Sequence, residues 1–135
     1  MDQAGKYGIL IVDDEKSNLN VLAHTLRQEY TVYTAKDGIT GIEIANEYLP
    51  DLILLDIIMP EMDGYEVIAK LKESERTKII PVIFITGLAN HESVEKGMSL
   101  GAADYIFKPF NAVTIKEKVE KQLKLSDDSL QQLTD

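Results

Sequence analysis

The chain alternates between short apolar segments and longer segments in which apolar residues recur every three or four positions. Five short segments are typical of β-strands, because they are rich in branched apolar residues and bounded by polar residues or glycine. They cover residues 8–12, 31–35, 52–55, 81–85 and 104–107. The segments 52–55 ("LILL") and 81–85 ("PVIFI") are continuously apolar. Such runs are typical of parallel strands that are covered on both faces.

The longer segments predict amphipathic helices, because their apolar residues form stripes at helical spacing. The stripes are Leu19/Leu22/Leu26, Ile42/Ala45/Leu49, Val67/Ile68/Leu71 and Ile115/Val119/Leu123. A weaker segment around Val94 and Met98 contains Gly97 and Gly101. Since glycine inside a helix costs about 1 kcal/mol relative to alanine, we expect this helix to be the softest element.

Five strand–helix units in succession predict an α/β fold. Parallel strands joined by helical crossovers form a doubly wound sheet with helices on both faces. In such sheets, ligands bind outside the carboxyl ends of the strands. The residues that end each predicted strand are therefore the first candidates for a functional site.

Polar side chains follow four of the five predicted strands. The first strand ends in Asp13 and Asp14, the third in Asp56, the fourth in Thr86 and the fifth in Lys108. The second strand, which we expect at an edge of the sheet, ends in Asp37, typical of a helix cap. The sequence therefore predicts three acids, a hydroxyl and a lysine at one edge of the sheet.

These side chains suit the chemistry of phosphoryl transfer. Three nearby carboxylates repel each other unless a cation intervenes. Oxygen ligands without histidine or cysteine favour Mg²⁺, with Mn²⁺ as the alternative ion. A lysine and a threonine hydroxyl can hold phosphoryl oxygens. An aspartate can form a covalent aspartyl phosphate, which makes Asp56 the candidate nucleophile.

Each residue also has an ordinary structural explanation when it is taken alone. Asp13 or Asp14 is a reasonable cap for the next helix, and Asp56 for the turn that follows it. Threonine is common in strands because it is β-branched. A lysine before a proline is usually a solvated loop residue. The functional interpretation depends on these residues meeting in space.

Composition narrows the classes of function. The chain has 135 residues, a net charge of −9 and no cysteine. The length predicts one domain, and the absence of cysteine excludes a disulfide framework or a thiolate metal site. A net negative charge disfavours direct nucleic-acid binding, which depends on cations meeting phosphates. No segment is typical of a signal peptide or a membrane span, so we expect a cytoplasmic protein.

Four sequence segments together resemble a known family. They are "VDDE" at 12–15, "LLDIIMPEMDG" at 54–64, "FITG" at 84–87 and "DYIFKPF" at 104–110. In this order and spacing they resemble the receiver domain of two-component response regulators (CheY-like), over roughly residues 8–125. The resemblance implies a flavodoxin-like fold whose five parallel strands lie in the order 2-1-3-4-5.

The resemblance also assigns roles to the acidic residues. Asp56 would accept a phosphoryl group from a histidine kinase or a phosphotransfer protein. Asp14 would bind Mg²⁺ directly and Asp13 largely through water. The backbone carbonyl of Ile58 would complete the metal ligands of the protein.

Further roles follow from the same resemblance. Thr86 and Lys108 would contact the phosphoryl group, and Tyr105 would be the switch aromatic that turns inward as Thr86 moves. The Lys108-Pro109 bond would be cis, as X-Pro bonds can be. Phosphorylation would then re-pack the face formed by the fourth helix, fifth strand and fifth helix, which would bias homodimerisation or partner docking.

Two positions depart from the commonest form of the family pattern. Gly87 follows Thr86 where alanine is frequent, so we expect small phosphodonors to enter easily. Ile58 places an apolar side chain beside the site, where it would alter the rate at which water attacks the phosphoryl group.

Alternative functions remain open from the sequence. A haloacid-dehalogenase-like phosphatase also uses an aspartate after a strand, but it normally has a second aspartate two residues later, where this chain has Ile58. A pseudo-receiver would keep the fold as a protein-binding module without being phosphorylated. A nucleotide-binding flavodoxin-like protein is disfavoured because neither a Walker A motif nor G-x-G-x-x-G occurs.

The predicted domain covers residues 6–125. Residues 126–135 ("SDDSLQQLTD") are polar and lie beyond the last apolar stripe. We expect them to form a tail or the start of a linker to an output domain. The segments "GAADYIFKPF" and "VEKQLKL" are similar to those of receivers attached to cyclic-dinucleotide enzymes or kinases.

Overall fold

A computed structural model describes residues 6–88 and 90–134 of the chain and consists of alternating strands and helices. The strands are β1 (Gly8–Val12), β2 (Thr31–Ala35), β3 (Leu52–Asp56), β4 (Val82–Thr86) and β5 (Asp104–Phe107). The helices are α1 (Lys16–Arg27), α2 (Gly38–Tyr48), α3 (Gly64–Glu73), α4 (His91–Ser99) and α5 (Ala112–Thr134). The predicted strands are confirmed, although β3 and β4 each end one residue later than predicted. Asp56 and Thr86 are thus the last residues of their strands.

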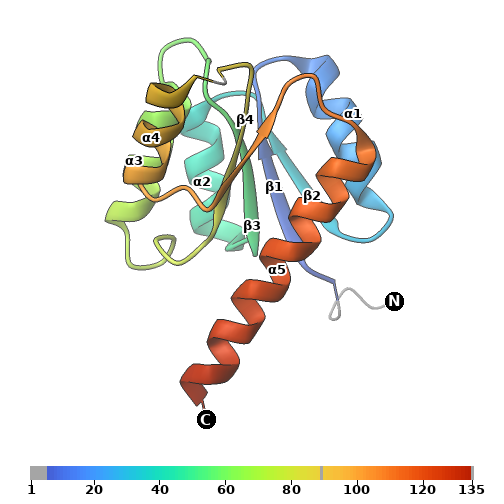
Figure 1. Ribbon diagram of the computed structural model, residues 1–135, viewed down its shortest axis with the longest axis vertical. Helices are drawn as coiled ribbons and strands as arrows, with labels where there is room; N and C mark the ends of the chain where they lie inside the picture. The colour runs from blue at the N-terminus through green and yellow to red at the C-terminus, as the bar shows by residue number, and fades with distance from the viewer. Residues whose placement is uncertain (1–5, 89, 135) are drawn as a thin grey trace.

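The strands form one parallel sheet in the order β2-β1-β3-β4-β5. Figure 1 shows that α1 and α5 cover one face of this sheet and that α2, α3 and α4 cover the other. The predicted doubly wound fold and its strand order are therefore confirmed. The reversal of strand order lies beside β1 and β3, whose carboxyl ends carry Asp13 and Asp56.

Alternation along the strands divides the core into two apolar layers. Leu10 and Leu55 face α2, α3 and α4, whereas Ile11 and Leu54 face α1 and α5. These four residues of the central strands are at most 1% exposed, because helices cover both faces of the sheet. This rigid centre fixes the ends of the strands where the polar residues lie.

Helices α2 and α3 each begin after an aspartate N-cap. The Asp37 carboxylate accepts a hydrogen bond from the Thr40 amide, which confirms the cap predicted for α2. Asp63 and Glu66 form a reciprocal capping box at the start of α3. These bonds satisfy amide groups that a helix start leaves without partners, so the helices begin at defined residues.

Helix α5 continues through the segment that the sequence predicted to be a tail or linker. It runs without a break to Thr134 and projects past the sheet at the end opposite the carboxyl ends of the strands (Figure 1). Residues 126–134 contain neither proline nor glycine, so no residue in them interrupts the helix. The backbone therefore shows no break at the predicted boundary after residue 125, and Asp135 lies outside the described residues.

Among the described helices, none is both long and apolar enough to cross a membrane.

Candidate functional site

The candidate site lies where β1 and β3 end side by side. Val12 pairs with Leu55, so the next residues, Asp13 and Asp56, meet at the carboxyl edge of the sheet. One carboxylate oxygen from each of Asp13, Asp14 and Asp56 lies within 4.8 Å of the other two. The structure therefore brings the three predicted acids together, Asp14 exposed and the other two buried.

Asp13 is 1% exposed and leaves one oxygen without a partner. Its Oδ1 accepts a hydrogen bond from the Glu15 amide at 2.9 Å. Its Oδ2 is buried and has no hydrogen-bond partner in the described part of the chain, with Lys108 Nζ 4.0 Å away. Burial raises the pKa of Asp13, although the Glu15 amide and Lys108 oppose this effect. A buried carboxylate oxygen without a donor is a natural cation ligand.

Asp56 is 4% exposed and lies between a carboxylate and a cation. Burial raises the pKa of Asp56 to about 6, and the negative charge of Asp13 adds to the effect, while Lys108 opposes it. Lys108 Nζ lies 3.4 Å from Asp56 Oδ1. This distance exceeds the 2.7–2.9 Å that is usual for a charge-assisted hydrogen bond. Lys108 therefore only partly offsets the charge of Asp56.

Thr86 and Lys108 are placed by the ends of β4 and β5. The Lys108 amide donates to the Thr86 carbonyl at 2.9 Å, which extends the pairing of the two strands by one bond. Thr86 is buried, and its Oγ1 accepts a hydrogen bond from the Leu88 amide at 2.9 Å. A hydroxyl that accepts this bond can still donate its own proton. The Lys108-Pro109 bond is cis, as the resemblance implied.

The acidic cluster fits a hard divalent cation. Its three ligand groups are carboxylates, and within residues 6–88 and 90–134 no histidine or cysteine joins them. Mg²⁺ prefers such oxygen ligands, uses few carboxylates and keeps several waters. The partnerless Oδ2 of Asp13 is the observation in this structure that favours a bound ion.

Ile58 and Gly87 lie in loops that follow the ends of the strands. The side chain of Ile58 is 61% exposed. A Cβ atom added at Gly87 would meet no other atom within 4 Å, so the space beside Thr86 is open. The predicted entry of small phosphodonors agrees with this space and stays a prediction.

Tyr105 points inward in this structure, and the inward turn that the resemblance implied on phosphorylation stays a prediction. Its side chain is buried, and its hydroxyl donates to the carbonyls of Ser93 and Val94 in α4, at 3.0 and 3.1 Å. Gly97 makes this approach possible, because a Cβ atom there would lie 1.9 Å from the Tyr105 hydroxyl oxygen. The structure thus shows a packing role for Gly97, whereas the softness that the sequence predicted for this helix stays a prediction.

The capping explanations account for little of the acidic cluster. Glu15, rather than Asp13 or Asp14, occupies the N-cap of α1, and its side chain makes no capping bond.

Sequence reasoning missed two other residues, Gly64 and Tyr65. An added Cβ at Gly64 would lie 2.5 Å from the Asp56 carbonyl oxygen, and Tyr65 contacts α4. The Asp63-Gly64 pair is typical of a turn and is the only sequence signal near Gly64. No pattern in the sequence indicates a role for Tyr65.

Comparison with known proteins places this geometry in a family. The family model described as "Response regulator receiver domain" matches residues 9–120. Response regulator PleD of Caulobacter vibrioides is 42% identical over 127 residues, covering 92% of this chain and 28% of that protein. A Vibrio cholerae protein named "Probable cyclic di-GMP phosphodiesterase" is 44% identical over 123 residues, covering 91% of this chain and 28% of that protein. The chain thus spans under a third of the length of these two relatives.

Solved structures agree with the family model. A CheY-like receiver domain protein from Methanospirillum hungatei has a TM-score of 0.87 at 28% identity, covering 93% of this chain and 99% of that one. The chemotaxis protein CheY4 of Vibrio cholerae has a TM-score of 0.84 at 30% identity, covering 87% and 98%. Family membership replaces the phosphatase and nucleotide-binding interpretations. The chain belongs to the response regulator receiver domain family, and it is a signalling receiver of the two-component type.

Proposed function

We propose that Asp56 accepts a phosphoryl group from a histidine kinase or a phosphotransfer protein. The observation that carries this proposal is the position of Asp56, which lies beside the partnerless oxygen of Asp13 and within 3.4 Å of Lys108 Nζ. With a pKa of about 6, Asp56 is largely ionised at neutral pH and can act as a nucleophile.

The transfer makes one bond and breaks one bond. A carboxylate oxygen of Asp56 attacks the phosphorus of the donor phosphohistidine, and the phosphorus–nitrogen bond breaks, with its electron pair leaving on the imidazole. The Lys108 ammonium and the Thr86 hydroxyl then stabilise the phosphoryl oxygens. Positioning and charge stabilisation of this kind account for most of the catalysis of phosphoryl transfer.

Mg²⁺, or Mn²⁺ in its place, would be held by Asp13, Asp14 and Asp56, with the Ile58 backbone carbonyl as a further ligand. The ion would supply positive charge that offsets the repulsion between the carboxylates and the incoming phosphate. The fit rests on the carboxylate cluster and on Asp13 Oδ2. Of these ligands, the carboxylates come from the loop after β1 and the end of β3.

Intact mass spectrometry tests the proposal. After incubation with acetyl phosphate and Mg²⁺, we expect one added phosphoryl group on the wild-type chain and none on Asp56→Asn. Hydroxylamine should remove the group, because it cleaves acyl phosphates. An adduct that survives in Asp56→Asn would place the modification elsewhere, and an unmodified wild-type chain would favour the pseudo-receiver interpretation.

We further propose that phosphorylation promotes a homodimer through the face formed by α4, β5 and α5. Met98 and Phe107 are exposed apolar side chains on this face, and they line a hollow together with Val94 and Pro109. Movement of Thr86 toward a phosphoryl group would reach this face through Tyr105, which contacts α4. Exposed apolar surface of this kind favours association.

Sedimentation velocity tests this dimer. With beryllofluoride (a phosphoryl mimic) and Mg²⁺, we expect the wild-type chain to shift from monomer to dimer, and Met98→Glu to stay monomeric. Ile79→Glu is the matched control, because Ile79 is exposed but lies in the loop before β4, away from this face. Equal dimerisation of both variants, or a wild type that stays monomeric, would contradict the proposed face.

A further inference from the structure

Helix α4 is held by few apolar contacts. Gly97 is the only buried residue in the helix. Val94 is partly buried against the core, whereas Met98 is exposed. Because little apolar area anchors α4, hydrogen bonds and ring contacts from neighbouring elements contribute more than usual to holding the helix in place.

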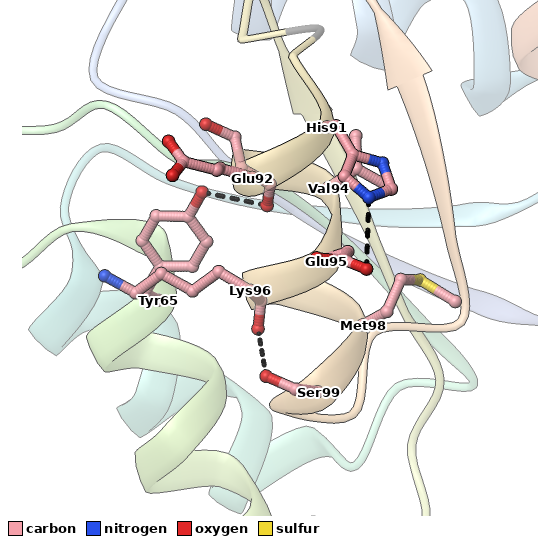
Figure 2. A pocket seen from close by; sticks show the side chains of 9 residues that line it. Tyr65, His91, Glu92, Val94, Glu95, Lys96, Met98 and Ser99 are labelled. Carbon is pink, nitrogen blue, oxygen red and sulfur yellow. Dashed lines mark hydrogen bonds and ion pairs between the residues drawn. The ribbon is translucent and has the colours of Figure 1, made fainter.

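Two tyrosines from different elements donate to the same carbonyl oxygen of α4. The Tyr105 hydroxyl of β5 lies 3.0 Å from the Ser93 oxygen, and the Tyr65 hydroxyl of α3 lies 3.2 Å from it. Figure 2 shows Tyr65 reaching from α3 to the first turn of α4, where the dashed line marks this bond. The single proton of the Tyr105 hydroxyl is shared between the Ser93 oxygen and the Val94 oxygen, which lies 3.1 Å away, so the Ser93 oxygen can also accept from Tyr65.

The Tyr65 ring adds two further contacts. Lys96 Nζ lies 4.4 Å from the ring centroid, so α4 also covers the ring with a cation (Figure 2). The ring packs edge-to-face on Phe84, with centroids 5.7 Å apart, and Phe84 in turn lies 5.5 Å from the Tyr105 ring. The three rings form a row from α3 to β5, and the two outer hydroxyls hold α4.

The backbone next to Tyr65 is packed against the candidate site. Gly64 begins α3, and its amide donates to the Ile57 carbonyl at 2.8 Å. A Cβ atom at Gly64 would lie 2.5 Å from the Asp56 carbonyl oxygen and 2.8 Å from Ile57 Cα. Any displacement of the backbone that carries Asp56 should therefore also displace Gly64 at the start of α3. The residue after Gly64 is Tyr65, which donates its hydroxyl to α4.

We propose that the Tyr65 hydroxyl is a second tether of α4 and couples its position to the Asp56 site through the start of α3. This route is separate from the one through Thr86 and Tyr105. The coupling rests on the proposed function, because a phosphoryl group at Asp56 is what would move the backbone of the site. Tyr65 is a positioning residue in this proposal, since it acts on the site through Gly64.

Hydrogen exchange of the metal-free chain is the first test. Tyr65→Phe removes the hydroxyl and keeps the ring with its Phe84 and Lys96 contacts. We expect amides of α4 to exchange roughly threefold to tenfold faster, because one hydrogen bond is lost from a weakly anchored helix. Exchange in α1 and α2 should not change. Tyr48→Phe is the matched control, because it removes the hydroxyl of an exposed tyrosine on α2.

The response of α4 exchange to beryllofluoride and Mg²⁺ is a second test. A Tyr65 hydroxyl that only stabilised α4, without coupling it to the site, would leave this response unchanged. If Tyr65 couples the site to α4, the beryllofluoride-dependent change in α4 exchange should be smaller in Tyr65→Phe than in Tyr48→Phe or the wild type. By reciprocity, the beryllofluoride concentration at half saturation should also change in Tyr65→Phe and not in Tyr48→Phe.

The outcomes separate this inference from the proposed function. A wild type that binds beryllofluoride, with α4 exchange that is the same in Tyr65→Phe, would overturn the tether and leave the phosphoacceptor proposal standing. Faster α4 exchange in metal-free Tyr65→Phe, in a chain that takes no phosphoryl group from acetyl phosphate, would support the tether and contradict the phosphoacceptor role of Asp56. Equal α4 exchange and no phosphorylation would contradict both.

Discussion

Asp56→Asn is expected to make the metal-free protein more stable at neutral pH, although it removes the proposed phosphoacceptor. The folded state buries the Asp56 carboxylate beside Asp13, which raises its pKa from 3.8 to about 6. A shift of this size corresponds to about 2–3 kcal/mol of lost stability when the group is ionised. Asparagine has a similar shape and no charge, so we expect a melting temperature about 5–10 °C higher at pH 7.5.

The pH dependence of this effect has a definite sign. Because the folded chain holds the Asp56 proton more tightly than the unfolded chain does, this contribution to stability is present below about pH 4. It is lost as the pH rises through about 6, where the folded group ionises. The gap between Asp56→Asn and wild-type melting temperatures should therefore be small at pH 4 and reach its full size above pH 7. Thermal melts with EDTA across this range measure it.

Two controls sharpen the experiment. Asp128→Asn makes the same chemical change on an exposed part of α5 and should leave the melting temperature within about 1 °C of the wild type. Millimolar Mg²⁺ should raise the wild-type melting temperature, because it binds the folded cluster, and should raise that of Asp56→Asn less. A metal-free Asp56→Asn that melts at or below the wild-type temperature would contradict the electrostatic strain in the cluster.

The positions of the main site residues were predictable because strand ends follow simple rules. Apolar runs located β1 and β3, and parallel strands bring their carboxyl ends to one edge of the sheet. The strand order 2-1-3-4-5 that the resemblance implied puts these two strands side by side, so Asp13 and Asp56 were expected to meet. The same reasoning placed Thr86 and Lys108 next to each other, as their backbone bond now shows. Such predictions need only the ends of the strands and their order in the sheet, which the apolar runs and the family resemblance supplied.

Contacts between helices and the sheet could not be predicted in this way. The partnerless oxygen of Asp13 depends on the direction of one carboxylate, and the approach of Gly97 to Tyr105 depends on how closely α4 packs. Tyr65 lies on α3, and its Ser93 partner is 28 residues away in sequence. Helix packing decides these distances, and the periodicity of apolar residues fixes only which face of a helix is buried.

The continuation of α5 shows a different limit. Apolar spacing marks where a helix packs on the core, and Leu123 is the last buried residue of that stripe. A helix ends where its backbone meets a breaker or a cap, however, and residues 126–134 contain no proline or glycine. The apolar stripe therefore located the part of α5 that packs on the core, whereas the helix itself continues to Thr134.

Gly64→Ala is expected to destabilise the protein and distort the site. The added Cβ would lie 2.5 Å from the Asp56 carbonyl oxygen and 2.8 Å from Ile57 Cα, and both atoms belong to backbone at the end of a fully buried strand. A flexible side chain could move away from the methyl group, but this backbone is held by pairing with β1 and β4. Overpacking of this kind costs about 2–3 kcal/mol, more than alanine regains as a better helix former.

Gly87→Ala is the matched control for this prediction, because its Cβ would meet nothing within 4 Å. Thermal melts should show a loss of about 5–10 °C for Gly64→Ala and a change within about 2 °C for Gly87→Ala. Labelling by acetyl phosphate should also slow in Gly64→Ala, because the backbone that carries Asp56 has shifted. Equal melting temperatures would mean that α3 can retreat from Asp56 at little cost. In that case the start of α3 could not relay a displacement of the site to Tyr65 and α4.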